Sequence, residues 1–214
     1  MALNANALTL LTTAKDHLDV PVDNNLYDDR IERMINQASG IIAGHTGRVL
    51  VNATHTEIYD GRRSNRIILN QYPITGGSAT GGKPELWINS NGDFSGDPVD
   101  PANYSFNDNE IVYIRGFSKG TANIQVIYQS GLGKIDSVAQ TNTLPSDLEL
   151  ACLDTVLWLY TSNTDRRIGL TSVSKSDESA AYFLGLPPHI EAILDANYTR
   201  LELPALAPVG VKNT

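Results

Sequence analysis

The chain has 214 residues, of which 41% are hydrophobic and 19% are charged, so it can bury the core of one or two globular domains. Its formal net charge of −8 excludes binding to duplex DNA by phosphate neutralisation, which needs clustered lysines and arginines. The single cysteine, Cys152, excludes an intrachain disulfide framework and a cysteine-based zinc site. Because Cys152 falls in an apolar helical pattern, we expect it to be a buried packing residue.

The N-terminal segment predicts two helices. The first covers residues 11–18, with Thr12 or Thr13 as its cap, and ends before Pro21. The second runs from about residue 25 to residue 45. Its apolar side chains recur at spacings of three and four; these are Ile31, Met34, Ile35, Ala38, Ile41 and Ile42. We expect Gly44 and Gly47 to end it and Asp28-Asp29 to complement its dipole.

This N-terminal segment has neither the features of a signal peptide nor those of a membrane anchor. The first twenty residues lack a basic leader, and no apolar run reaches membrane-spanning length. We therefore expect the chain to be made and folded in a cytoplasm.

The hydrophobic period changes after residue 48. Residues 49–128 are rich in Gly, Asn, Asp and Tyr and contain short alternating runs. Two of these runs, residues 53–61 and 66–74, flank the turn sequence DGRRSN and predict a hairpin. Four more candidate strands cover residues 85–89, 104–106, 110–116 and 122–131. We expect a small, mostly antiparallel β unit with long polar loops.

The helical period returns near Pro145, a favourable first-turn residue. The helix that follows is apolar on many sides, so we expect it at the centre of its domain. Residues 165–183 are small and hydroxyl-rich and predict a loop. A last helix spans about residues 188–203.

The order of these segments predicts an α+β fold, a small helical bundle with an inserted, mostly antiparallel β unit. Each helical part has too few helices to form a core alone, so we expect residues 1–47 and 144–203 to share one domain. Residues 48–143 form the β insertion, and residues 204–214 form a flexible C-terminal tail. Residues 1–47 and 144–214 carry net charges of −3 and −4, and the insertion carries −1.

The sequence GGSATGGKP at residues 76–84 partly matches a phosphate-binding loop. Gly77 and Gly82-Lys83 have the required spacing, but Pro84 replaces the hydroxyl residue that would hold Mg²⁺. The next residues alternate like a strand, whereas a phosphate-binding loop opens a helix. We expect a flexible loop between two strands, and we expect Lys83→Ala to leave function intact.

Other possible sites lack a complete pattern. The histidines are far apart in the sequence, and residues 91–102 resemble a calcium loop but have Ala102 at the position of the bidentate glutamate. We find no G-x-S-x-G motif and no other nucleophile pattern. The sequence therefore predicts no catalytic residue, no cofactor and no metal ligand.

The GRRSNR sequence gathers Arg62, Arg63 and Arg66 in one turn. One interpretation is a solvated turn. The other is a contact with an acidic neighbour, because an acidic body and a basic turn in one chain suit head-to-tail self-association.

Five segments, in order, resemble the head–tail connector proteins of long-tailed bacteriophages, also called head-completion or adaptor proteins. They are residues 8–20 together with 38–50, the strand at 122–133, the helix at 144–160, the Arg-containing and Ser-rich loop at 166–183, and the helix at 186–200. The resemblance covers nearly the whole chain, although each motif alone is a general packing or turn pattern. The insertion is longer than the usual pattern, above all at residues 76–83 and 89–101. The resemblance implies that residues 76–84 form a surface loop of a ring subunit that is ordered by neighbouring molecules.

The resemblance implies structural work in a virion rather than catalysis. Such proteins form a ring of about twelve subunits that docks on the portal, joins the head to the tail and extends the DNA channel. Expected partners are other copies of the chain, the portal protein and the next tail-side connector or stopper, with DNA passing without specific binding. The expected location is the head–tail interface, after assembly in the bacterial host cytoplasm. Expected contact residues are Arg62, Arg63, Arg66, Arg166, Arg167, Pro204, Leu206, Pro208 and Val209.

Two other classes of function stay open at this point. The Tyr, Trp and Asn content of the insertion suits a carbohydrate- or surface-binding β module on a helical stalk, which predicts an exposed Trp87 among polar neighbours. An enzyme with a site built from scattered residues is the second alternative.

Overall fold

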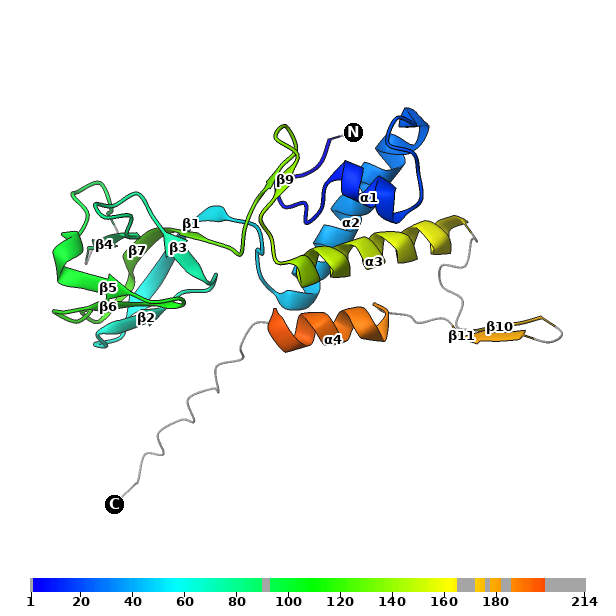
Figure 1. Cartoon of the computed structure of the whole chain (residues 1–214). Coiled ribbons are helices and arrows are strands. Elements are labelled where there is room, and N and C mark those ends of the chain that lie inside the picture. The colour runs from blue at the N-terminus through cyan, green and yellow to red at the C-terminus, as the bar shows by residue number, and fades with distance from the viewer. Residues whose placement is uncertain (1, 90–92, 165–171, 176–177, 182–185, 199–214) are drawn as a thin grey trace, which may run out of the picture.

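The computed structural model describes residues 2–89, 93–164, 172–175, 178–181 and 186–198. Over these residues it shows an α+β protein with four α-helices and several small antiparallel sheets, which confirms the predicted fold class. Figure 1 shows the helices gathered at one end of the molecule and strands β1 to β7 at the other, joined by two extended segments. No helix in the described part of the chain is long and apolar enough to span a membrane.

The helical end consists of α1 (Leu11–His17), α2 (Asp28–Thr46), α3 (Ser146–Thr164) and α4 (Pro188–Asn197). Helix α3 packs against the other three, as its apolar surface predicts, although Leu150 and Leu157 remain exposed. One hydrophobic cluster joins residues from all four helices and includes both Ile35 and Val156. The two helical parts of the sequence therefore share a core, and the exact domain boundaries stay a prediction.

The helix ends differ in part from the predictions. Leu10 is the N-cap of α1, and its side chain makes no capping bond, so the prediction of a Thr12 or Thr13 cap is wrong. Helix α2 follows a short 3-10 turn, η1 (Asn25–Tyr27), and continues through Gly44 to end at Gly47. Gly47 has a φ of 66°, a left-handed conformation that glycine adopts without a steric penalty. Helix α4 is described to Asn197, so residues 199–203 of the predicted helix lie outside the described residues.

The β unit contains two antiparallel sheets around a second hydrophobic cluster. In the first, β7 (Gly120–Ser130) pairs with β1 (Ala53–Gly61) on one side and with β3 (Ile74–Gly76) and β4 (Glu85–Ile88) on the other. In the second, β6 (Glu110–Tyr113) lies between β2 (Arg66–Ile68) and β5 (Tyr104–Phe106). A short 3-10 turn, η2 (Pro101–Asn103), precedes β5. The cluster includes Ile124, Val126 and Tyr128, which the alternation of β7 predicts to share one face.

The predicted hairpin of residues 53–61 with residues 66–74 is wrong. Strand β1 pairs with β7 over nearly its whole length, and β2 pairs with β6. The turn at residues 62–65 therefore carries the chain from one sheet to the other. Strand β7 is the longer partner and has three fully buried apolar side chains, so β1 gains more from pairing with it than from the short β2.

Two further hairpins lie outside the β unit. Strands β8 (Ile135–Asp136) and β9 (Thr141–Asn142) form one beside the helices, where Thr12 Oγ1 donates to Gln140 Oε1 at 2.8 Å. Strands β10 (Ser172–Lys175) and β11 (Glu178–Ala181) form the other, within residues that the sequence predicts as a loop. That prediction is wrong for these eight residues, whose cross-strand backbone bonds do not depend on apolar alternation.

The two segments that join the helical end to the β unit lie side by side. The amide of Leu132 donates to the carbonyl of Leu50 at 2.9 Å, and the amide of Asn52 donates to Gly133 at 2.7 Å. Paired connections restrict relative motion more than two separate linkers would. Residues 48–52 and 131–133 therefore form the structural junction of the molecule.

Candidate functional site

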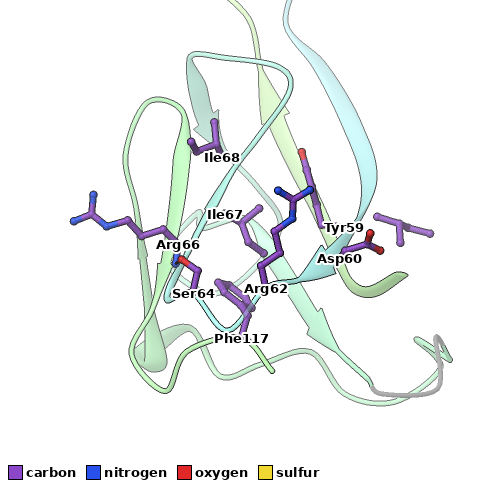
Figure 2. Close-up of a pocket in the computed structure, with 9 residues that line it drawn as sticks. Tyr59, Asp60, Arg62, Ser64, Arg66, Ile67, Ile68 and Phe117 are labelled. Carbon is purple, nitrogen blue, oxygen red and sulfur yellow. Dashed lines mark hydrogen bonds between the residues drawn. The ribbon is translucent and has the colours of Figure 1, made fainter. Parts of the chain in front are cut away.

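The basic turn that the sequence singles out borders a pocket of about 700 Å³. Strands β1 and β2 and the segment before β7 form the pocket, which has an apolar interior and a polar margin (Figure 2). Nine side chains line it: Ile58, Tyr59, Asp60, Arg62, Ser64, Arg66, Ile67, Ile68 and Phe117. The chain passes from the first sheet to the second at residues 62–65. Strands β1 and β2 diverge there, and this divergence creates the pocket.

The three arginines of the turn occupy different positions. In the view of Figure 2, Arg62 extends between Ile67 and Tyr59, and Arg66 points away from them. Arg66 lies 3.5 Å from Glu110, and within the described part of the chain no ion-pair partner is found for Arg62. Arg63 is exposed and has a φ of 59°, a backbone conformation that residues other than glycine rarely adopt. The turn thus presents one cation over the pocket, and its use in binding is a proposal below.

The glycine-rich loop is a closed turn between β3 and β4. Gly77 donates its amide to Gly82 at 2.9 Å, and Ala79 donates to Lys83 at 3.0 Å. Lys83 Nζ donates to the carbonyl of Pro101 at 2.6 Å and to that of Tyr104 at 3.0 Å. Strand β4 follows Pro84, as expected, so this loop does not open a helix. Contacts within the chain order this loop, and the expectation that it depends on neighbouring molecules is wrong.

Lys83→Ala is expected to lower the free energy of unfolding by about 1 kcal/mol, because two backbone carbonyls lose a charged donor. Urea unfolding measures this, with Lys119→Ala, an exposed lysine of the same β unit, as the matched control. Neither the unaltered chain nor the variant is expected to bind ATP or GTP. Micromolar nucleotide binding that Lys83→Ala abolishes would restore the phosphate-loop interpretation.

Two of the four histidines share one carboxylate partner. His17 from α1 and His189 from α4 lie 3.3 Å and 3.5 Å from the two carboxylate oxygens of Asp154 in α3. His45 lies 2.7 Å from Asp195 and joins α2 to α4. These contacts cross the helical bundle. Over the described ranges, no three His, Cys, Asp or Glu side chains are arranged to hold a metal ion.

The remaining candidates that the structure describes have structural roles. Cys152 is fully buried 3.8 Å from Ser39 Oγ, and burial raises the pKa of its thiol to about 12, which confirms the packing role. In the calcium-like segment, Asp93 accepts the amide of Ser95 at 3.0 Å, and Asp100 caps η2. Arg166, Arg167 and the tail residues Pro204, Leu206, Pro208 and Val209 lie outside the described residues.

Arg48 is a residue that sequence reasoning missed. It is buried at the junction, where Nη1 donates to the carbonyl of Tyr198 at 3.3 Å and Nη2 donates to the carbonyl of Tyr72. Its guanidinium also lies 3.8 Å from the centre of the Tyr72 ring. Burial lowers the pKa of Arg48, and the neighbouring Tyr72 opposes that effect. The only sequence signal was its position between the last residue of α2 and the first strand.

The fold and the candidate site together describe an α+β protein whose β unit carries a pocket beside a basic turn. The profile of the family described as "Head completion protein" matches residues 21–201. The chain therefore belongs to the head completion protein family, which confirms the resemblance found in the sequence. Because this is a family of structural proteins, membership also confirms that the chain is not an enzyme.

Three solved structures share this fold along nearly the whole chain. The first is the neck of an empty gene transfer agent particle computed with C6 symmetry, with a TM-score of 0.62 and 16% sequence identity. The second is the virion of a native gene transfer agent particle, with a TM-score of 0.60 and 16% identity. The third is the neck of a native particle computed with C12 symmetry, with a TM-score of 0.60 and 17% identity. In each comparison 96% of both chains is covered. No curated protein matches the chain significantly.

Proposed function

We propose that the chain is a subunit of a ring that docks on the portal of a phage-like particle, joins head to tail and extends the DNA channel. The observation that carries this proposal is the family match over residues 21–201. The chains of similar fold belong to particle necks computed with C6 and C12 symmetry, which supports a ring of about twelve subunits at the head–tail interface. The next tail-side connector or stopper would bind the opposite face of the ring, and assembly would take place in the host cytoplasm.

The charge distribution supports passage of DNA without binding. The helical parts, residues 1–47 and 144–214, carry a combined charge of −7, and the insertion carries −1. An acidic lining repels phosphates and releases no counterions on contact, so DNA would slide along it. We place the acidic helical end toward the channel and the β unit outward or toward the tail.

No specific observation favours the carbohydrate-binding alternative. That alternative predicts an exposed Trp87, but the Trp87 side chain is half-buried and its indole N–H donates to the carbonyl of Gly96 at 3.3 Å. A sugar-binding platform needs an open aromatic face. The ring subunit is therefore the function that we propose.

Deletion of residues 204–214 is expected to leave the chain folded and to impair its attachment to the portal. The tail is rich in Pro, Ala and Val and has no pattern of a core element, so its removal costs little folding free energy. The assay is co-sedimentation with portal-bearing, DNA-filled heads that lack this protein. The expected result is that the full chain binds and the deleted chain binds at least tenfold less.

The control is a chain in which a Gly/Ser segment of equal length replaces residues 204–214. It separates loss of tail sequence from loss of chain length. Equal binding by the full and deleted chains would remove the tail from the mechanism. Failure of the full chain to bind the heads would contradict the proposed function itself.

A further inference from the structure

A protruding segment between α1 and α2 exposes apolar side chains among acidic ones. Within residues 19–27, which we term the acidic knob, Leu26 is 79% exposed and Val22 is 55% exposed. Asp19 and Asp23 are exposed beside them. Together with Tyr27, which is 37% exposed, Leu26 and Val22 gather three apolar side chains in one short segment, and an apolar patch rimmed by polar residues is typical of a contact surface.

Hydrogen bonds hold the backbone of the acidic knob in place. The buried Lys15 donates from Nζ to the carbonyl of Val22 at 3.0 Å and also pairs with Asp28. Asn24 Oδ1 accepts the amide of Leu26 at 3.2 Å. A segment held in this way loses little conformational entropy on binding, because its shape exists beforehand.

The pocket at β1 and β2 has the opposite charge and a matching apolar surface. Ile58 is 54% exposed and Ile68 is 44% exposed, and both line the pocket with the buried Ile67. Arg62 is the cation over the pocket, whereas Arg66 lines its margin but points away and lies 3.5 Å from Glu110 (Figure 2). Asp60 is the one acidic lining residue, and its Oδ1 accepts the amide of Ala122 at 2.7 Å. An acidic-apolar segment therefore suits this pocket in both charge and polarity.

We infer that the acidic knob of one subunit occupies the β1–β2 pocket of the next subunit. The occupant is a second copy of this chain, and the inference rests on the proposed ring. Leu26 would enter the apolar interior, while Asp23 would face Arg62. Figure 1 shows the α1–α2 segment on the side of the helical end away from β2, so the two surfaces belong to opposite ends of the molecule. A contact between two different surfaces is heterologous and propagates from copy to copy until it closes a ring.

Engineered cysteines test the contact, because the one native cysteine is buried. The double variant Leu26→Cys with Ile68→Cys is bound to portal-bearing heads and oxidised, and the chains are separated under non-reducing conditions. We expect a ladder of covalent oligomers longer than a dimer. A disulfide forms only where the two Cα atoms approach within about 7 Å, so the ladder reports direct contact. A mixture of the two single variants is expected to give dimers only, because each chain then carries one reactive end.

In the matched control, the first cysteine is placed at another exposed leucine instead of at Leu26. Leu150 in α3 is 45% exposed and has no role in the knob, so Leu150→Cys with Ile68→Cys is expected to give no ladder. A ladder of equal yield from this control overturns the inference. So does the absence of a ladder from the test pair on heads that have bound the chain, and in that case the proposed function stands. If the chain does not bind the heads at all, the proposed function and the inference both fail.

Charge reversal provides a second measurement that does not depend on cysteine chemistry. Asp23→Arg and Arg62→Glu are each expected to weaken the contact about twofold to fivefold, and the double variant is expected to restore it. The readout is the amount of chain bound per head as a function of chain concentration. The effect should be larger at low salt, where exposed charges are least screened. Additive losses in the double variant would contradict a direct contact between these charges.

Discussion

Replacement of Val156 by Asp is expected to abolish soluble expression of the chain. Val156 is 1% exposed in α3 and belongs to the cluster that also contains Ile35 of α2. An aspartate at this position would be buried without a cationic partner, which costs several kcal/mol. Since folded domains are stable by only about 5–15 kcal/mol, this loss is enough to populate the unfolded chain.

The neighbouring residue provides the control for this experiment. Leu157 is 38% exposed on the same helix, so Leu157→Asp places the charge in water and is expected to leave solubility nearly unchanged. The measurement is the soluble fraction of each variant in cell lysate, followed by thermal unfolding of the soluble protein. Equal solubility and equal midpoints for the two variants would show that Val156 does not belong to an essential core.

The helices could be predicted from the sequence because their spacing is a local property. The recurrence from Ile31 to Ile42 defines the buried face of α2, and the structure buries Ile31, Met34, Ile35, Ala38 and Ile42. Ile41 belongs to the same sequence pattern but remains 37% exposed, since it lies at the edge of that face. A helix needs only its own residues to satisfy its backbone, so a local pattern is sufficient.

Strand pairing could not be predicted in the same way, because alternation identifies a strand but not its partner. The turn sequence between β1 and β2 predicts a hairpin, whereas β1 pairs with β7 about 70 residues later, at a register that joins Tyr59 to Ile124. The pairing depends on the burial of both strands against one cluster. This is a tertiary property that neither strand carries alone.

The candidate site was predictable only in part for the same reason. The charge of Arg62, Arg63 and Arg66 is evident in the sequence, but the pocket beside them forms only where two sheets diverge. Lys15 and Arg48 resemble ordinary surface cations in the sequence, and the structure buries both. Their partners are mainly backbone carbonyls, which have no sequence signature.

Gly131→Val is expected to produce the largest effect on the junction. Gly131 has a φ of 140°, and a Cβ at this position would lie 2.5 Å from the backbone nitrogen of Asn52 and 2.6 Å from its Cα. A side chain therefore requires a strained φ and displaces the opposite segment. Strain and overpacking each cost about 1–3 kcal/mol, so we expect a loss of roughly 2–6 kcal/mol.

The chain's two tryptophans can show which end of the molecule loses stability. Trp87 lies in β4 of the β unit and Trp158 lies in α3 of the helical end, so single Trp→Phe replacements leave one fluorescent probe at each end. In urea, the unaltered junction is expected to give coincident transitions from both probes. Gly131→Val is expected to shift the Trp87 transition to lower urea than the Trp158 transition, because Gly131 also donates its amide to the carbonyl of Pro73 within the β unit, at 3.2 Å.

A substitution at a second glycine provides a control, because its expected change in the free energy of unfolding has the opposite sign. Gly44 lies inside α2, and a Cβ there would meet no atom within 4 Å. Gly44→Ala is therefore expected to stabilise the chain by about 0.5–1 kcal/mol, because alanine loses less backbone entropy in a helix. If Gly131→Val leaves both transitions in place while Gly44→Ala shifts them upward, the assay is sensitive enough and the junction tolerates a side chain. The pairing of residues 50–52 with 131–133 would then not be what holds the two ends of the molecule together.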